Sequence, residues 1–186
     1  LECKSISVTG TSALTNSSDT TYLVARAADG ITFGADVTVT SSGNQFVLGG
    51  DVTAASAVNV NIASGMLNHV KENTSENKNW SSTVTPVLQN GGCTFGMAEG
   101  TSYNPKISAA AGDVYFVGNG TFASLDDAGA GCNIHFGNND ATQSNAFTFA
   151  SDIAFNTTGN IILDASCTEL TGSGALSGIK EIVNQS

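Results

Sequence analysis

The stretch Ile31-Thr-Phe-Gly-Ala-Asp-Val-Thr-Val39 is followed closely by Phe46-Val-Leu-Gly-Gly-Asp-Val-Thr-Ala54, and both follow one plan. An apolar-x-apolar triplet comes first, then two small residues and an aspartate, then a second triplet that begins with an apolar residue. Each triplet has the pattern of a short β-strand that buries alternate side chains. The Gly and Asp residues between triplets let the chain turn a corner, because they tolerate unusual backbone dihedrals and can bond their own backbone. The plan predicts a strand–corner–strand unit.

The same unit recurs late in the chain, at 114–122, 147–155 and 161–169, and its first half recurs at 134–139. Units begin at 31 and 46 in the early cluster and at 134, 147 and 161 in the late one, so the steps between them are nearly equal. Near-regular steps of this kind are typical of coils that add one above another. We therefore predict an all-β fold of stacked short β-arches, a β-solenoid. A β-sandwich or jelly roll is the alternative.

The length of 186 residues and mass of 18.8 kDa predict a single domain over 1–186. The stretch at about 65–112 is polar and holds the only Trp and both Pro residues, so we expect a loop-rich excursion there. The segment 176–183 has apolar residues at 176, 179, 182 and 183, a spacing that predicts a short C-terminal helix. Such a helix would cap one open end of the solenoid.

Sixteen acidic and six basic side chains give a formal charge of −10. This balance argues against partners such as nucleic-acid backbones and anionic membrane surfaces, both of which attract Lys and Arg clusters. No apolar run is long enough to predict a membrane-spanning helix. The opening Leu1-Glu-Cys-Lys4 has no signal-peptide pattern and no initiator Met. With few charged residues and many Ser, Thr, Asn and Gly, the chain is expected to be extracellular or at the cell surface, after removal of a signal peptide.

Four cysteines lie far apart in the sequence, with no C-x-x-C pair: Cys3, Cys93, Cys132 and Cys167. Their spacing argues against thioredoxin-type and zinc-ribbon sites. In a chain that is expected to be extracellular, we predict that they form disulfides, within one subunit or between subunits. The sequence does not choose among the three intramolecular connectivities.

Known catalytic motifs are absent from the sequence, which contains no G-x-S-x-G, H-E-x-x-H, P-loop or G-x-G-x-x-G pattern. The spacing Cys132-Asn-Ile-His135 resembles a metal-ligand pair. On a strand, however, Cys132 would lie on the core side with Ile134, and His135 would lie on the opposite, surface side. We therefore predict no metal site there and no enzymatic activity.

Two sets of residues remain as candidate binding sites. Asp36, Asp51 and Asp152 occupy equivalent corners of the repeat. Stacked in register, their carboxylates would repel one another unless a cation such as calcium lay between them, whereas in the alternative interpretation each caps its own turn. Within the 65–112 excursion, Asn79, Trp80 and Tyr103 are candidate contacts for a carbohydrate or a host receptor.

Composition and repeat style resemble those of extracellular β-solenoid proteins, including autotransporter passenger domains. Two F-x-x-N tetrapeptides, Phe116–Asn119 and Phe136–Asn139, resemble the repeats of chlamydial polymorphic membrane proteins, whose companion G-G-A-I/L/V motif this chain does not contain. In composition and class the chain also resembles the disulfide-linked, amyloid-like sheath proteins of methanogenic archaea. No site residue carries over from any of these families.

Together these features favour a non-enzymatic structural protein whose partners are copies of itself and other cell-surface components. Pairing at strand edges, reinforced by disulfides, would build a sheath, surface layer or fibre. The alternative function is an adhesin domain that binds its ligand through the 65–112 excursion.

Overall fold

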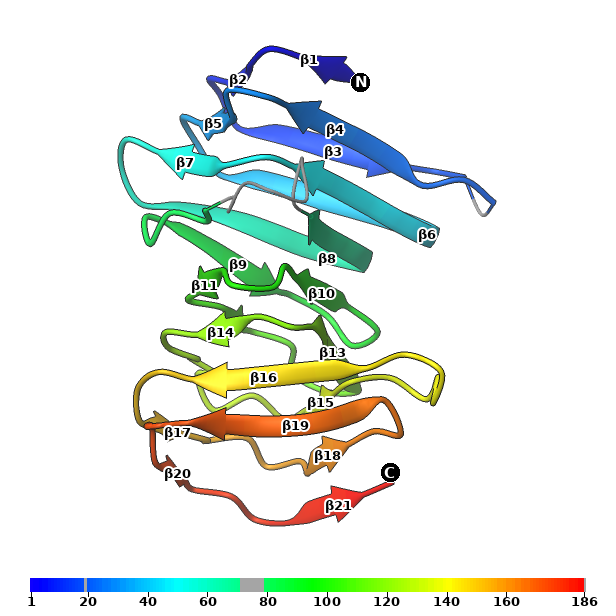
Figure 1. The fold of residues 1–186 in the computed structure, drawn as a ribbon, viewed down its shortest axis with the longest axis vertical. Helices are drawn as coiled ribbons and strands as arrows, with labels where there is room; N and C mark the ends of the chain where they lie inside the picture. The colour runs from blue at the N-terminus through cyan, green and yellow to red at the C-terminus, as the bar shows by residue number, and fades with distance from the viewer. Residues whose placement is uncertain (19, 71–78, 186) are drawn as a thin grey trace.

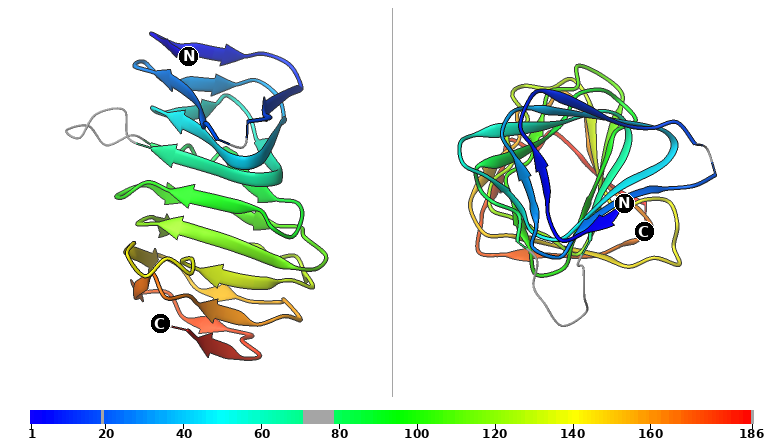
Figure 2. Two further views of the ribbon diagram at one scale, coloured as in Figure 1. Left: turned by 90° about the vertical axis from the view of Figure 1, so that its right-hand side faces the viewer. Right: turned by 90° about the horizontal axis from the view of Figure 1, so that it is seen from above.

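The computed structural model describes residues 1–18, 20–70 and 79–185, and it is a parallel β-solenoid. The chain winds from the N-terminus at one end of an elongated stack to the C-terminus at the other (Figure 1). Seen along the stack, successive turns superimpose in one closed outline (right-hand view of Figure 2). The predicted solenoid is confirmed, and every strand pair described is parallel, which excludes the antiparallel sandwich or jelly roll.

Each turn contributes strands to three faces, visited in the same order each time. Face 1 consists of β1 (Glu2–Cys3), β4 (Leu23–Ala27), 45–49 of β6 (Val37–Gly49), 66–70 of β8 (Val58–Val70), β10 (Thr94–Met97), β13 (Asp113–Gly118), β15 (Asn133–Phe136), β18 (Ile161–Leu163) and β21 (Ile182–Asn184). Face 2 consists of β2 (Ile6–Val8), β5 (Ile31–Phe33), β7 (Val52–Ala54), β11 (Ser102–Tyr103), β14 (Thr121–Phe122), β16 (Asn145–Phe149) and β19 (Cys167–Gly172). Face 3 consists of β3 (Ser12–Asn16), 37–41 of β6, 58–62 of β8, β9 (Val84–Leu88), β12 (Lys106–Ile107), β17 (Ile153–Ala154) and β20 (Leu176–Ser177).

The repeat seen in the sequence is shorter than one turn of the solenoid. On face 1, Phe46 pairs with Leu67 and Phe95 pairs with Phe116, so partners lie further apart in the sequence than successive unit starts do. The unit at 31–39 runs from face 2 to face 3, whereas the unit at 46–54 runs from face 1 to face 2. The step between two unit starts is therefore the number of residues between two corners of the solenoid. It is not the number of residues in one complete turn.

The interior is a continuous apolar core formed by the inward side chains of all three faces. On face 1 the column of Phe46, Leu67, Phe95, Phe116 and Phe136 is almost wholly buried. Because side chains on a strand alternate, the residues between these column members point outward, away from the core. Face 1 therefore has an apolar inner surface and a separate outer surface of mixed composition.

In its described part, the range 65–112 is not a loop-rich excursion. It carries the end of β8 together with β9, β10, β11 and β12, which pair with neighbouring turns on all three faces. Residues 71–78 lie outside the described part. The loop prediction is wrong because outward strand positions in a solenoid can be polar at every second residue, so a polar stretch can still consist of strands.

The segment 176–183 forms no helix. It contains β20 and the start of β21, and Leu176 pairs with Ile153 while Ile182 pairs with Ile161. Between them Gly178 has a φ of +71°, which an α-helix cannot contain. The apolar spacing thus reflects two strands on adjacent faces rather than one helical face. Within the described residues, no helix is long and apolar enough to cross a membrane.

Candidate functional site

A groove with a volume of about 730 Å³ lies on the outer side of face 1. It runs across the ends of β6, β8, β10 and β13 and continues to the 138–145 loop that follows β15. Its lining consists of Gln45, Met66, Asn68, Thr94, Tyr115, Val117, Gly118, Asn138, Gln143, Ser144 and Asn145. Among the described residues that line it, none is acidic or basic, in a chain whose net charge is −10.

Strand register brings the groove residues together from positions far apart in the sequence. Gln45 pairs with Met66, Met66 with Thr94, and Thr94 with Tyr115, so these four outward side chains form one row across the turns. Asn68 lies in the next outward row, and its Nδ2 donates to Gln45 Oε1 at 3.0 Å. Parallel in-register pairing thus builds a mixed polar and aromatic surface from residues that carry no joint motif.

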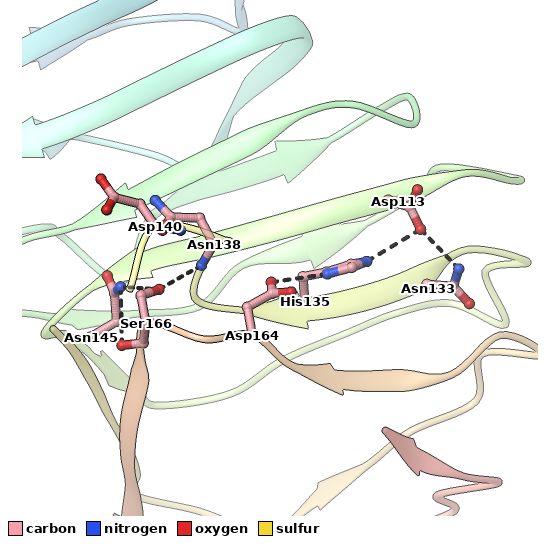
Figure 3. A network of polar contacts seen from close by, with 8 residues as sticks. All are labelled: Asp113, Asn133, His135, Asn138, Asp140, Asn145, Asp164 and Ser166. Carbon is pink, nitrogen blue, oxygen red and sulfur yellow. Dashed lines mark hydrogen bonds and ion pairs between the residues drawn. The ribbon is translucent and has the colours of Figure 1, made fainter. Parts of the chain in front are cut away.

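A polar network lies beside the groove and is drawn in Figure 3. The ring of His135 lies between two carboxylates, with Nδ1 at 2.9 Å from Asp164 Oδ2 and Nε2 at 3.2 Å from Asp113 Oδ1. Asp164 is fully buried. Asn133 Nδ2 also donates to Asp113 Oδ1 at 2.8 Å. These hydrogen bonds, that from Asn133 above all, lower the pKa of Asp113 below its usual value.

His135 is buried, contrary to the prediction of a surface residue. It does point away from the core, because Ile134 and Phe136 on either side are inward. Its burial comes from neighbouring turns: Asp164 covers one side, and the ring of Tyr115 packs against it with centroids 4.4 Å apart. The sequence could not reveal this, because each covering residue belongs to another turn.

A second cluster, also in Figure 3, holds the loop at the end of the groove. The buried Ser166 hydroxyl oxygen accepts from Asn138 N at 2.7 Å and from Asn145 Nδ2 at 2.7 Å. Asn145 Oδ1 in turn accepts from the backbone N–H of Gly118 on face 1. Within the loop, Asp140 Oδ1 accepts from the backbone N–H and the hydroxyl of Thr142. The loop wall is therefore fixed by bonds to two other turns.

The chemistry of the His135 network is that of a clamp. Both imidazole nitrogens lie within hydrogen-bond distance of carboxylate oxygens, so the ring is held between Asp113 and Asp164. With both nitrogens engaged, the ring has none left to activate a nucleophile. The clamped His135 ring fixes the position of the Tyr115 ring, which lines the groove.

Two of the three predicted ligand contacts are buried in the core. Trp80 is 5% exposed and Tyr103 is 1% exposed, and both rings pack edge-on around Phe95. Trp80 Nε1 donates to Val84 O at 2.7 Å. Asn79 is exposed, and its backbone N–H donates to Asp51. Neither buried ring can contact a ligand from solution, so these three residues do not form one binding surface.

No sequence motif indicates that His69 belongs to this aromatic cluster. Its Nε2 lies 2.8 Å from Gly50 O, so that nitrogen carries the proton, and Nδ1 accepts from the Tyr103 hydroxyl at 2.7 Å. The Tyr103 oxygen in turn accepts from Ala98 N at 2.8 Å. Burial lowers the pKa of His69, which favours the neutral ring that this chain of bonds requires.

The three corner acids do not stack on one another. Asp36 accepts two bonds from Asn59, Asp51 accepts from Asn79 N at 2.8 Å, and Asp152 accepts from Ala175 N at 2.8 Å. Each donor lies one turn further along the solenoid, so the aspartates cap the next turn rather than their own. Among the described residues, no three His, Cys, Asp or Glu side chains are grouped so as to hold a metal ion.

All four cysteines are free thiols in the structure. Cys93 and Cys132 are buried near face 1 in turns separated by β13, which is about 10 Å at the usual strand spacing and too far for a disulfide. Burial raises the pKa of the Cys132 thiol to about 11 and also raises that of Cys93. Cys3 is exposed in the first turn and Cys167 is partly buried in β19. The predicted disulfides are therefore not seen.

Comparison with known proteins gives no identity to set beside this geometry. No protein-family model matches the chain, and no curated protein and no solved structure matches it either. The chain is therefore characterised by its structure alone. It is a three-faced parallel β-solenoid with an uncharged groove on face 1, and His135 is held between two carboxylates beside that groove.

Proposed function

We propose that this chain is a non-enzymatic structural protein that self-assembles outside the cell, by stacking the last turn of one copy on the first turn of the next. One observation carries the proposal: the apolar core is open at the first turn. A hollow of about 320 Å³ lies there, lined almost wholly by apolar atoms of residues such as Ile6, Leu14, Leu23, Phe33 and Phe46. Leaving such a surface in water is unfavourable, at about 25 cal/mol for each Å².

The last turn offers a matching apolar surface. Leu176 is 38% exposed and Ile182 is 55% exposed, and both belong to strands that pair on one side only within the described chain. Burying one end against the other would extend the core across the junction.

Strand edges at the two ends are complementary. Within the described chain, β1, β2 and β3 pair on one side only at the first turn, and β21, β19 and β20 do so at the last turn. Because all strands are parallel, a copy placed on the last turn can continue face 1 by setting its β1 on β21. Such a head-to-tail contact joins two different surfaces along the solenoid axis, so repeating it extends a filament.

Disulfides have no part in this proposal. Stacking places β1, which carries Cys3, against β21, whose residues Ile182–Asn184 include no cysteine. Cys93 and Cys132 are buried, so neither can reach a neighbouring copy. Cys167 is partly buried in β19 on face 2, away from Cys3 on face 1, so we expect a non-covalent assembly.

The test uses the purified 186-residue chain and two variants, each of which blocks one end. Leu14→Lys places a charge in the hollow of the first turn, and Ile182→Lys places one on the last turn. Wild type is expected to form filaments, seen by negative-stain microscopy and sedimentation, with and without a thiol reductant. Each variant alone should stay monomeric. An equimolar mixture should give dimers and no larger species, because only one intact end of each kind remains.

Thr32→Lys serves as the control, because Thr32 is exposed on the outer side of face 2 and should not affect assembly. Circular dichroism establishes that each variant is folded. Wild-type chain that stays monomeric at high concentration would overturn the proposal, as would filaments that persist in either single variant.

A further inference from the structure

We propose that the groove on the outer side of face 1 binds an uncharged glycan chain, with the Tyr115 ring as its stacking platform. The inference is independent of end-to-end stacking, because the groove lies on the side of the solenoid and its described lining includes no residue of the first or last turn. Four observations carry it: the chemistry of the lining, the fixed position of Tyr115, the packing of Asn68 over Gly96, and the distribution of charge.

Amide side chains dominate the polar part of the lining. Gln45, Asn68, Asn138, Gln143 and Asn145 each carry a planar group with both donors and acceptors. Sugar hydroxyls also donate and accept, so paired bonds to an amide suit them well. Asn68 Nδ2 bonds to Gln45 Oε1, and in the described part of the chain the Gln45 amide nitrogen and the Asn68 oxygen have no partner. These two groups can take the hydroxyls of a bound sugar.

Tyr115 lines the groove and packs its ring against His135. In the outward row it stands between Thr94 on β10 and His135 on β15. Its ring packs on His135 at 4.4 Å with an interplanar angle of 34°, and Asp113 and Asp164 hold that imidazole from both sides. Tyr115 and its neighbour Thr94 both line the groove. An aromatic ring fixed in this way offers a flat surface for the C–H groups of a pyranose.

Gly96 leaves room for the Asn68 amide beside the groove. It pairs with Asn68 on one side and Val117 on the other. A Cβ at this position would collide with Asn68 Oδ1 and Cγ, so a side chain here would displace the Asn68 amide. The absence of a side chain at Gly96 thus lets Asn68 lie flat across β10, where its amide lines the groove.

The charge distribution of the protein disfavours the binding of charged polymers in the groove. None of the described lining residues is acidic or basic, so neither an anion nor a cation finds a charged partner there. The net charge of −10 repels polyanions such as uronate polymers. From Gln45 to Tyr115 the groove crosses three strand spacings, about 14 Å, which is room for a short oligosaccharide rather than a single sugar.

The experiment titrates the chain with soluble uncharged hexasaccharides, namely those of β-1,4-glucose, β-1,4-N-acetylglucosamine and β-1,4-mannose, by calorimetry and saturation-transfer NMR. A hexamer of galacturonate is the anionic comparison. At least one uncharged hexasaccharide is expected to bind, and the galacturonate hexamer at least tenfold more weakly. Failure of all three uncharged probes to bind at millimolar concentration would overturn the proposal, and so would preferential binding of the anionic one.

Variants locate the site. Tyr115→Ala should weaken binding at least tenfold, whereas Tyr115→Phe, which keeps the ring, should bind within threefold of wild type. Gly96→Ala should also weaken binding by displacing Asn68, without touching Tyr115. Tyr22→Ala is the matched control, because Tyr22 is 58% exposed but lies outside the groove. Wild-type affinity in folded Tyr115→Ala would overturn the assignment, and circular dichroism checks the fold of each variant.

Discussion

The turns before residue 70 and those after residue 113 build the same solenoid by different means. In the earlier turns, β6 and β8 are each 13 residues long and run without interruption from face 3 to face 1, over a core rich in Val and Ile. In the later turns, strands are two to six residues long and the core is aromatic. The Phe122 ring has three other Phe rings with centroids 5.0 to 5.7 Å from its own: Phe116, Phe136 and Phe149.

Cross-turn polar bonds occur in both regions, for example from Asn16 and Asp36 in the earlier turns, and the buried ones are more numerous after residue 113. After residue 113, Asp127, Asn133, Asn145 and Ser166 are largely buried and bond to the backbone of another turn. β-branched residues favour long pleated strands, whose ladders tie turns together along their length. Where strands are short, ring packing and corner side chains take over that role. One solenoid can therefore be stabilised by the backbone hydrogen bonds of long strands in one region, and by aromatic packing and corner side chains in another.

The largest expected effect comes from removing a ring in the later turns. Phe122→Ala should lower the free energy of unfolding by about 3–5 kcal/mol, because it deletes a fully buried ring that packs against four others. In the earlier turns, Ile62→Val should cost about 0.5–1.5 kcal/mol. Urea denaturation followed by circular dichroism measures both. Equal losses in the two variants would contradict the claim that rings dominate the later core.

Replacing a corner aspartate should also lower the free energy of unfolding by different amounts in the two regions. Asp127 is 1% exposed and accepts from Asn156 N at 2.6 Å and Thr157 N at 2.8 Å, so Asp127→Ala leaves buried donors without partners. We expect a loss of up to about 3 kcal/mol. Asp36→Ala, at a half-buried corner of the earlier turns, should cost about 1 kcal/mol. The same denaturation experiment compares them, and a larger loss for Asp36→Ala would reverse the expected order.

Acid should weaken the junction between the regions through His69. Burial lowers its pKa in the folded chain below the ordinary value of about 6.5. Between those two values the unfolded chain binds more protons, so stability rises with pH through this window and falls as pH drops below about 6.5. His69→Gln should show less of this decline than wild type. An identical pH dependence of unfolding in the two proteins would show that the ring does not titrate on unfolding.

The smallest effects are expected on the outer surface of face 2, where the two regions are alike. Thr32 and Thr53 form a hydroxyl pair at 3.1 Å in the earlier turns, and Thr148 and Thr171 form one at 3.4 Å in the later turns. Thr53→Ala and Thr171→Ala should each change the free energy of unfolding by less than about 0.5 kcal/mol. A loss above about 1 kcal/mol in either would mean that outward ladders contribute more than the usual surface substitution.

Much of the fold could be predicted from local pattern. The triplets at 31–33 and 52–54 are strands that begin with a buried apolar residue, and Gly50 and Asp51 form the corner that precedes the second of them. The wrong predictions are those that depend on which turn lies above which. They include the step between unit starts as a coil period, the range 65–112 as a loop-rich excursion, the segment 176–183 as a helix, and His135 as a surface residue. In each case a strand partner in another turn decides the outcome.

The groove could not be predicted because it has no local pattern. Gln45, Thr94 and Tyr115 become neighbours only through the registers of β6, β8, β10 and β13. No pair of these residues lies close in the sequence, and each is an ordinary outward strand residue by itself.

By itself, the sequence determined the strand–corner–strand unit, the alternation of inward and outward side chains, and the acidic charge of the chain. These properties depend on residues that are near neighbours, where backbone preference and alternate burial act directly. Only the tertiary structure decided the length of a turn, the partners of the corner aspartates, the clamp around His135 and the lining of the groove. All of these are contacts between turns, and they depend on register, which is set by the packing of the whole core.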